Sequence, residues 1–200
     1  MKPRRGWGLL LGCLFAAMVA QAAALEPRGA RLVVSGTLDG QRSAAFAAHL
    51  ASGQVRTVVF EDSTGGLFEV AEDYARAIRA AGADTEVHGA CHAACAYAFM
   101  AGRQRRFGDD EQVHSLLIPL PSRVAGPQVR GTLVEFGAPP TAPAPGEPRQ
   151  PAQGLLVTAT PTLFGRVYSL LWCDGTQGRD SSRCERIDGA DPFEAGMLTP

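Results

Sequence analysis

The chain has 200 residues and a mass of 21.0 kDa, which suits one domain of ordinary size with appendages. Hydrophobic residues make up 46% and charged residues 20%, a globular composition that excludes a disordered chain. The net charge of −1 and the mean hydropathy of −0.02 predict neither a nucleic-acid partner nor a protein with several membrane spans.

The first 24 residues have the features of a secretory signal peptide. Three basic residues within the first five positions precede an apolar run over 7–20, and small-residue A-x-A cleavage sites end at Ala22 and Ala24. The apolar run is shorter than the roughly 20 residues that a membrane span needs. We therefore expect a signal peptide over 1–24, a periplasmic or secreted mature protein, and no stable membrane insertion after cleavage.

Strand and helix patterns alternate over 25–120. The clearest helix pattern is 67–81, where apolar residues recur on one face and Gly82 follows as a stop signal. Ala-rich segments predict two further helices, at 43–50 and 92–100. Runs of apolar and β-branched residues predict strands at 31–38, 55–60, 85–87 and 112–120. Such alternation predicts an α/β core with mostly parallel pairing.

The sequence changes character after Pro119. Gly and Pro recur over 121–154, which predicts a loop or insertion, with a short strand at 132–136. The remaining residues, 155–200, are expected to complete the same domain. Thr160 is a suitable helix cap and Pro161 a suitable first helical residue, so we predict a helix to residue 172 followed by a polar, Cys-containing tail.

The segment Ser63-Thr64-Gly65-Gly66 lies between a predicted strand and a predicted helix. Backbone N–H groups in such a turn, at the positive end of a helix, can hold a carbonyl oxygen, an oxyanion or a phosphate. A tight turn that needs positive φ explains the paired glycines equally well.

Four cysteines follow residue 24, an even number in a chain expected to be exported. We favour two disulfides, Cys91–Cys95 and Cys173–Cys184. An alternative is a redox or zinc module built on the Cys/His cluster at 88–95.

In this order, the motifs resemble those of exported members of the Clp-protease/crotonase superfamily. The family has S-x-G-G after a strand, C-x-S-A-C before a helix that ends A-G-x-x-R, and a histidine on the next strand. The resemblance covers residues 31–118. Residues 195–199 are also similar, more weakly, to the segment that closes the family's domain. The matching residues are Ser63, Gly65, Gly66, Cys91, Ala94, Cys95, Ala101, Gly102, Arg105 and His114. The resemblance implies repeated β-β-α units wound into a superhelix, here with a Pro-rich insertion and a C-terminal helix.

The resemblance also implies a serine-hydrolase site. In the family, the serine of C-x-S-A-C attacks a carbonyl, the histidine is the base, and an acid orients the histidine. Transferred by position, the base is His114, the oxyanion donors are Gly66 and Ala94, and the supporting turn residues are Ser63 and Gly65. For the acid, Asp174, Asp180 and Asp188 all lie in the right region, and we favour Asp180.

The position of the family's serine is occupied by Ala93. A methyl group cannot attack a carbonyl, so the family's covalent route is lost and His114 becomes a vestigial base. We therefore predict a non-catalytic binding or scaffolding pseudoenzyme for a peptide or protein ligand, with self-association allowed and with no cofactor, metal or nucleic acid. The alternatives are a hydrolase that uses His114 with water or an unrecognised nucleophile, a crotonase-type enzyme that needs no nucleophile, and the Cys/His module.

Overall fold

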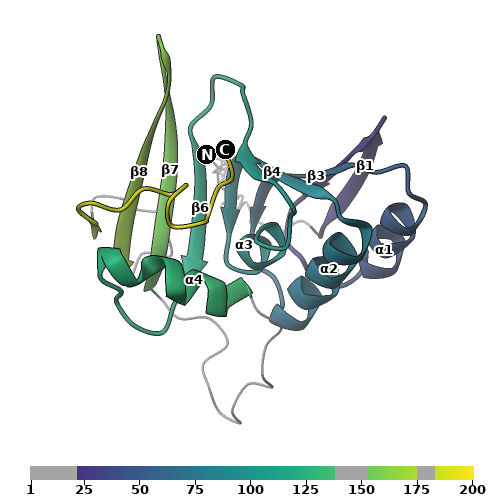
Figure 1. The fold of residues 1–200 in the computed structure, drawn as a ribbon. Helices are drawn as coiled ribbons and strands as arrows, with labels where there is room; N and C mark the ends of the chain where they lie inside the picture. The colour runs from purple at the N-terminus through teal and green to yellow at the C-terminus, as the bar shows by residue number, and fades with distance from the viewer. Residues whose placement is uncertain (1–21, 138–152, 175–182) are drawn as a thin grey trace, which may run out of the picture.

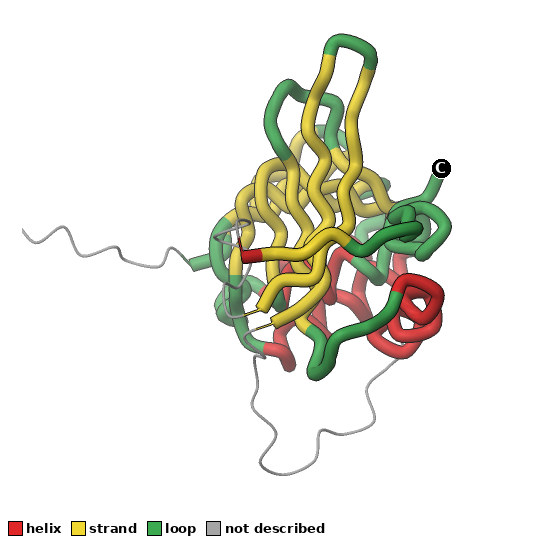
Figure 2. The backbone as a smooth tube through the Cα atoms, turned by 90° about the vertical axis from the view of Figure 1, so that its left-hand side faces the viewer, coloured by secondary structure: helices red, strands yellow, loops and turns green. Residues whose placement is uncertain are grey.

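The computed structural model describes residues 22–137, 153–174 and 183–200. They form a mixed α/β structure with one nine-stranded sheet, whose strand order is β1-β2-β3-β4-β6-β7-β8-β9, with β5 paired to β4. The helices gather on one side of the strands (Figures 1 and 2). No helix in these ranges is long and apolar enough to cross a membrane.

The first half of the chain builds the parallel centre of the sheet, as the alternating patterns predict. Its strands are β1 (Ala24–Arg28), β2 (Arg31–Ser35), β3 (Thr57–Thr64), β4 (Asp84–His92), β5 (Arg105–Phe107) and β6 (His114–Pro119). Its helices are α1 (Ser43–Ala51), α2 (Phe68–Ala81) and α3 (Ala94–Phe99). Gly82 ends α2 in the left-handed conformation. The strands from β2 to β6 pair in parallel, and β1 joins the β2 edge antiparallel.

The helix predicted to end at residue 172 is wrong, because this segment forms a hairpin. β7 (Gln153–Thr162) and β8 (Gly165–Asp174) pair antiparallel, and β9 (Cys184–Arg186) follows on β8. β7 also pairs with β6. Leu155 and Val157 pack into the main core and Leu156 into a second cluster, so both faces of β7 are buried and it lacks the simple alternation of a surface strand. Pro161 is tolerated because β6 pairs with β7 only as far as Ala159.

The strand predicted at 132–136 is also wrong. A 3₁₀ turn, η1 (Gly126–Gln128), leads into helix α4 (Val129–Gly137), so part of the segment predicted as a loop is helical. Val129 and Leu133 are buried four residues apart, the spacing of one helix face. The Pro-rich stretch at 138–151 lies outside the described residues.

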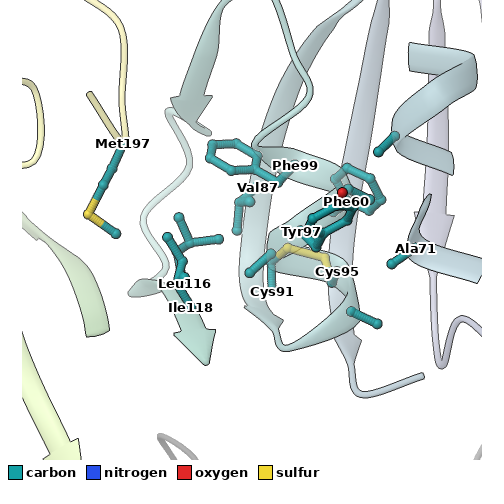
Figure 3. Close-up of a cluster of buried hydrophobic side chains, with 14 of the residues drawn as sticks. Phe60, Ala71, Val87, Cys91, Cys95, Tyr97, Phe99, Leu116, Ile118 and Met197 are labelled. Carbon is teal, nitrogen blue, oxygen red and sulfur yellow. A yellow bond between two sulfur atoms is a disulfide. The ribbon is translucent and has the colours of Figure 1, made fainter. Parts of the chain in front are cut away.

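The core lies between the sheet and its helices, and it extends to the end of the chain. Phe60, Val87, Phe99 and Leu116 are buried side by side, and Met197 from the C-terminal segment joins them (Figure 3). The described residues contribute single strands to one sheet. The β-β-α superhelix that the resemblance implies therefore stays a prediction.

Candidate functional site

Ala93 forms a strained turn between the strand β4 and the helix α3. Its backbone has φ 58° and ψ −113°, and Asp62 is the other described non-glycine residue with positive φ. The Ala93 N–H donates to the Leu117 carbonyl at 3.0 Å, and its carbonyl accepts from the Tyr97 N–H at 3.2 Å. A sharp strand-to-helix turn of this kind exposes the nucleophile in many hydrolases. Position 93 therefore has the conformation of a nucleophile elbow but carries a methyl group.

Replacing Ala93 with glycine should stabilise the protein by about 1 kcal/mol, because strain at such a residue costs roughly 1–3 kcal/mol and glycine loses more backbone entropy on folding. The matched control is Ala96→Gly within α3, which should destabilise by about 1 kcal/mol. Urea unfolding of the two variants measures both changes. Equal destabilisation by the two glycines would show that Ala93 is not strained.

The glycine turn lies directly against this elbow. Gly66 has φ 123°, and a Cβ atom there would come within 2.6 Å of the Leu38 carbonyl oxygen and 3.1 Å of the Ala94 Cβ. Gly65 donates its N–H to the His92 carbonyl at 3.2 Å, and the Ser63 hydroxyl donates to the Gly36 carbonyl at 2.7 Å. The structure thus brings the predicted turn residues to the predicted nucleophile position.

Between the turn and the elbow is a small pocket of about 30 Å³. It is lined by Gly66, Phe68, Ala93, Ala94, Tyr97, Pro119 and Phe136. The ring centroid of Tyr97 lies 4.9 Å from that of Phe68 and 5.4 Å from that of Phe136, so aromatic rings wall the pocket. A cavity of this size accommodates about one or two water molecules. It can therefore admit a carbonyl oxygen or a methyl group.

The pocket lining contains no group that could act as a base at neutral pH. Tyr97 is its one titratable residue, and burial raises the pKa of that phenol. Within the described part of the chain, the pocket lining therefore contains neither a nucleophile nor a base.

The predicted base, His114, is not brought to Ala93. In the pairing of β6 with β4, Leu117 lies opposite His92, so His114 lies beside Gly89. Gly89 precedes Ala93 by four residues, and at roughly 3.3 Å per strand residue this separates His114 from position 93 by about 13 Å. His114 is fully buried, and its Nδ1 accepts the Gly89 N–H at 2.9 Å. Nε2 therefore carries the proton and donates to the Gly108 carbonyl at 3.0 Å. Burial is the main reason that its pKa is lowered.

Beside His114 lies an ionic network that the sequence analysis missed. Glu86 Oε1 lies 2.6 Å from His88 Nε2, and His88 Nδ1 lies 2.5 Å from an oxygen of Asp110. His88 thus lies between the carboxylates of Glu86 and Asp110. Arg31 and Arg106 also contact Glu86, at 2.5 and 2.9 Å. The alternation of Glu86 and His88 along one strand was the available signal, because it places them on the same face.

A His–Ser pair lies on the face of the sheet opposite the helices. His92 Nε2 is 2.9 Å from the Ser115 hydroxyl, and both side chains are half-buried. Ser115 does face away from His114, but the same alternation brings it to His92 on the neighbouring strand. β6 is paired on both sides, so the N–H groups around Ser115 are committed to the sheet and offer no oxyanion hole.

The cysteines pair as predicted. The S–S distances are 2.01 Å for Cys91–Cys95 and 1.99 Å for Cys173–Cys184. Bonded sulfurs cannot serve as zinc thiolates, and no three potential ligands in the described ranges are placed to hold a metal. Cys91 and Cys95 are fully buried, whereas a redox cysteine needs access. Asp180, the predicted acid, lies outside the described residues.

No protein-family model matches the sequence, and no curated protein matches it significantly. Several solved structures are similar over part of their length. An enoyl-CoA hydratase from Polaromonas sp. JS666 is 15% identical with a TM-score of 0.34, and 48% of this chain covers 51% of that one. An enoyl-CoA hydratase from Mycobacterium avium subsp. paratuberculosis K-10 is 11% identical with a TM-score of 0.36, and 48% of this chain covers 49% of that one.

A methylmalonyl-CoA decarboxylase is 11% identical with a TM-score of 0.37, and 62% of this chain covers 52% of that one. The chain thus spans about half the length of the solved structures it matches. Overlaps of this size assign neither an activity nor a family, so the functional argument rests on the residues of the site.

Proposed function

We propose that this chain is an exported, crotonase-like pseudoenzyme that binds a partner without catalysis. The observation that carries the proposal is Ala93, which keeps the strained elbow conformation and offers a methyl group where the resembling family has its nucleophile. Strain of this kind persists where the surrounding structure enforces it, which fits a site inherited from a catalyst.

The pocket supports binding of one small group. Its aromatic and aliphatic walls suit an apolar group or a carbonyl oxygen of a peptide or protein ligand. A volume of about 30 Å³ is too small for a drug-sized substrate, since such sites span roughly 300–1,000 Å³.

The disulfide bonds support export. Both disulfides are of the kind that persists in oxidising compartments. The predicted signal peptide falls mostly in residues 1–21, outside the described residues, but Ala23 is buried and Ala24 pairs with Ser35 in β1. Cleavage after Ala22, the earlier of the two predicted sites, leaves these residues in the fold.

A hydrolase that uses another nucleophile is the second candidate, and the 2.9 Å contact between His92 and Ser115 is the observation that favours it. The paired strands around Ser115 weigh against it, because they leave no donors for an oxyanion.

Turnover assays with nitrophenyl esters and an enoyl thioester separate the two candidates. The proposal predicts that the purified protein gives no rate above that of the same protein after denaturation. The Ser115→Ala variant is the matched control, because it removes the hydroxyl and keeps the strand. Saturable turnover that Ser115→Ala abolishes would establish the hydrolase, and turnover that survives it would place a catalytic site elsewhere.

A further inference from the structure

The hairpin β7–β8 ends in an exposed apolar tip. Leu163 and Phe164 are 96% and 99% exposed at the turn, and Val113 and Val167 beside it are 55% and 53% exposed. Four of the six large hydrophobic residues exposed in the described chain thus lie at this one end. The hairpin extends well beyond the rest of the sheet (Figures 1 and 2). We call these four residues the apolar tip.

Strand pairing and hydrogen bonds of Arg166 hold the apolar tip in place. The two strands pair without interruption from Gln153 and Asp174 to Thr162 and Gly165. Arg166 donates to the Ala159 carbonyl at 3.2 Å and to the Gln112 carbonyl at 2.9 Å, which ties the hairpin to the loop before β6. Apolar side chains exposed on a well-anchored projection are typical of a binding surface.

A groove of about 840 Å³ lies between α1 and α2 at the other end of the sheet order. Its lining includes Ala44, Ala47, Ala51, Ala77, Ala80 and Ala81, with Leu50 and Val55 among them. Small-molecule sites are lined by aromatic side chains and a few convergent polar groups, and this lining contains no aromatic residue. Small side chains instead leave room for large apolar ones.

Charges around the two features are complementary. Asp109 and Glu111 are exposed in the loop that Arg166 ties to the hairpin. Arg56 and Arg76 are exposed along the groove, where Arg76 pairs with Asp73 at 2.9 Å. The acidic surroundings of the apolar tip therefore suit the arginines of the groove.

We propose that the apolar tip of one molecule inserts into the α1–α2 groove of a second copy of this chain. The tip and the groove lie at opposite ends of the molecule (Figure 1), so the contact is head-to-tail, and it closes into a ring or extends as a filament. This inference is independent of the pocket at Ala93 and of whether the protein is catalytic.

Sedimentation velocity of the mature protein over a range of concentrations tests the contact with two pairs of variants. Phe164→Asp alters the tip, and its control is Val134→Asp, an exposed valine on α4. Ala47→Glu alters the groove, and its control is Ala48→Glu, an exposed alanine on the same helix outside the groove lining. Each test variant should weaken self-association at least tenfold, and each control should leave it unchanged. Far-UV circular dichroism confirms that all four variants are folded.

Mixing the two test variants distinguishes this contact from other modes of association. Phe164→Asp retains an intact groove and Ala47→Glu an intact tip, so the mixture should form one-to-one dimers that grow no further. Self-association that Ala47→Glu leaves intact would indicate tip-to-tip pairing and overturn the proposal. A protein that stays monomeric at every concentration would also overturn it. If that monomer sediments with phosphatidylglycerol vesicles and Phe164→Asp prevents this, the tip binds a membrane.

Discussion

Replacing Glu86 with glutamine should lower the free energy of unfolding by about 3 kcal/mol at pH 7, the lower end of the cost of breaking a buried ion pair. Glu86 is only 4% exposed, and it accepts hydrogen bonds from Arg31, Arg106 and His88. Arg31 and Arg106 are partly exposed and can be hydrated in the variant, so we expect a loss of stability at the lower end of that range. Urea unfolding of the variant and the natural protein measures the difference.

The effect of Glu86→Gln should depend on pH. Burial alone would raise the pKa of Glu86, but hydrogen bonds from Arg31, His88 and Arg106 outweigh it and lower the pKa from 4.5 to about 2. Because the folded pKa lies below the unfolded one, the carboxylate contributes its full stability above about pH 4.5 and loses it as the pH falls toward 2. The gap between variant and natural protein should therefore shrink to about 1 kcal/mol at pH 3.

Asp84→Asn is the matched control on the same strand, because the partner of Asp84, Arg103, has a 70% exposed side chain. An exposed pair contributes about 0–1 kcal/mol, so this variant should change little at either pH. A Glu86→Gln effect that is equally small, or that is unchanged at pH 3, would contradict the account of the network.

Arg105→Ala should destabilise the fold by about 3 kcal/mol, because it removes charge-assisted hydrogen bonds from partly buried carbonyls. The guanidinium donates to Met197 at 3.1 Å, to Gly196 at 2.8 Å and to Gly102 at 2.9 Å. It thereby holds the C-terminal segment, whose Met197 and Leu198 are buried in the core. Amide hydrogen exchange of that segment should accelerate in the variant, and urea unfolding measures the loss.

Arg103→Ala is the control for this prediction, since it removes an arginine two residues away that forms an exposed pair with Asp84. It should cost less than 1 kcal/mol and leave the exchange of the C-terminal segment unchanged. Arg105→Lys should not restore stability, because an ammonium group cannot reproduce the planar donor fork. Equal effects of the Arg103 and Arg105 variants would contradict a clamping role for Arg105.

The alternating core was predictable from sequence, but the second half of the chain was not. Over 31–118, α1 and α2 each bury one face and α3 is buried throughout, so local apolar patterns identified the elements. In the hairpin, Leu163, Val167 and Leu170 match a helical stripe as well as they match strands. Pairing with β6, which is distant in sequence, selects the strand. Local propensity does not contain that information.

The candidate site also has features that were predictable from the local sequence and features that were not. The glycine turn, the position of Ala93 and both disulfides are local features, and each of them was predicted from the sequence. The role of His114 was assigned by motif order alone. Its distance from Ala93 depends on the register of β6 against β4, which hydrogen bonds between strands set. The contact between His92 and Ser115 depends on the same register.

The most direct test of the central claim is labelling of the purified protein and its Ala93→Ser variant with a fluorophosphonate probe, followed by mass spectrometry of the labelled peptide. The lining formed by the described residues offers the natural protein no nucleophile, and it offers no base that could activate a serine at position 93. Neither protein should therefore be labelled, while a serine protease in the same tube should react fully. Labelling of the natural protein at Ser115 or another residue would contradict the pseudoenzyme account. Labelling of Ala93→Ser alone would show that a base still serves the pocket.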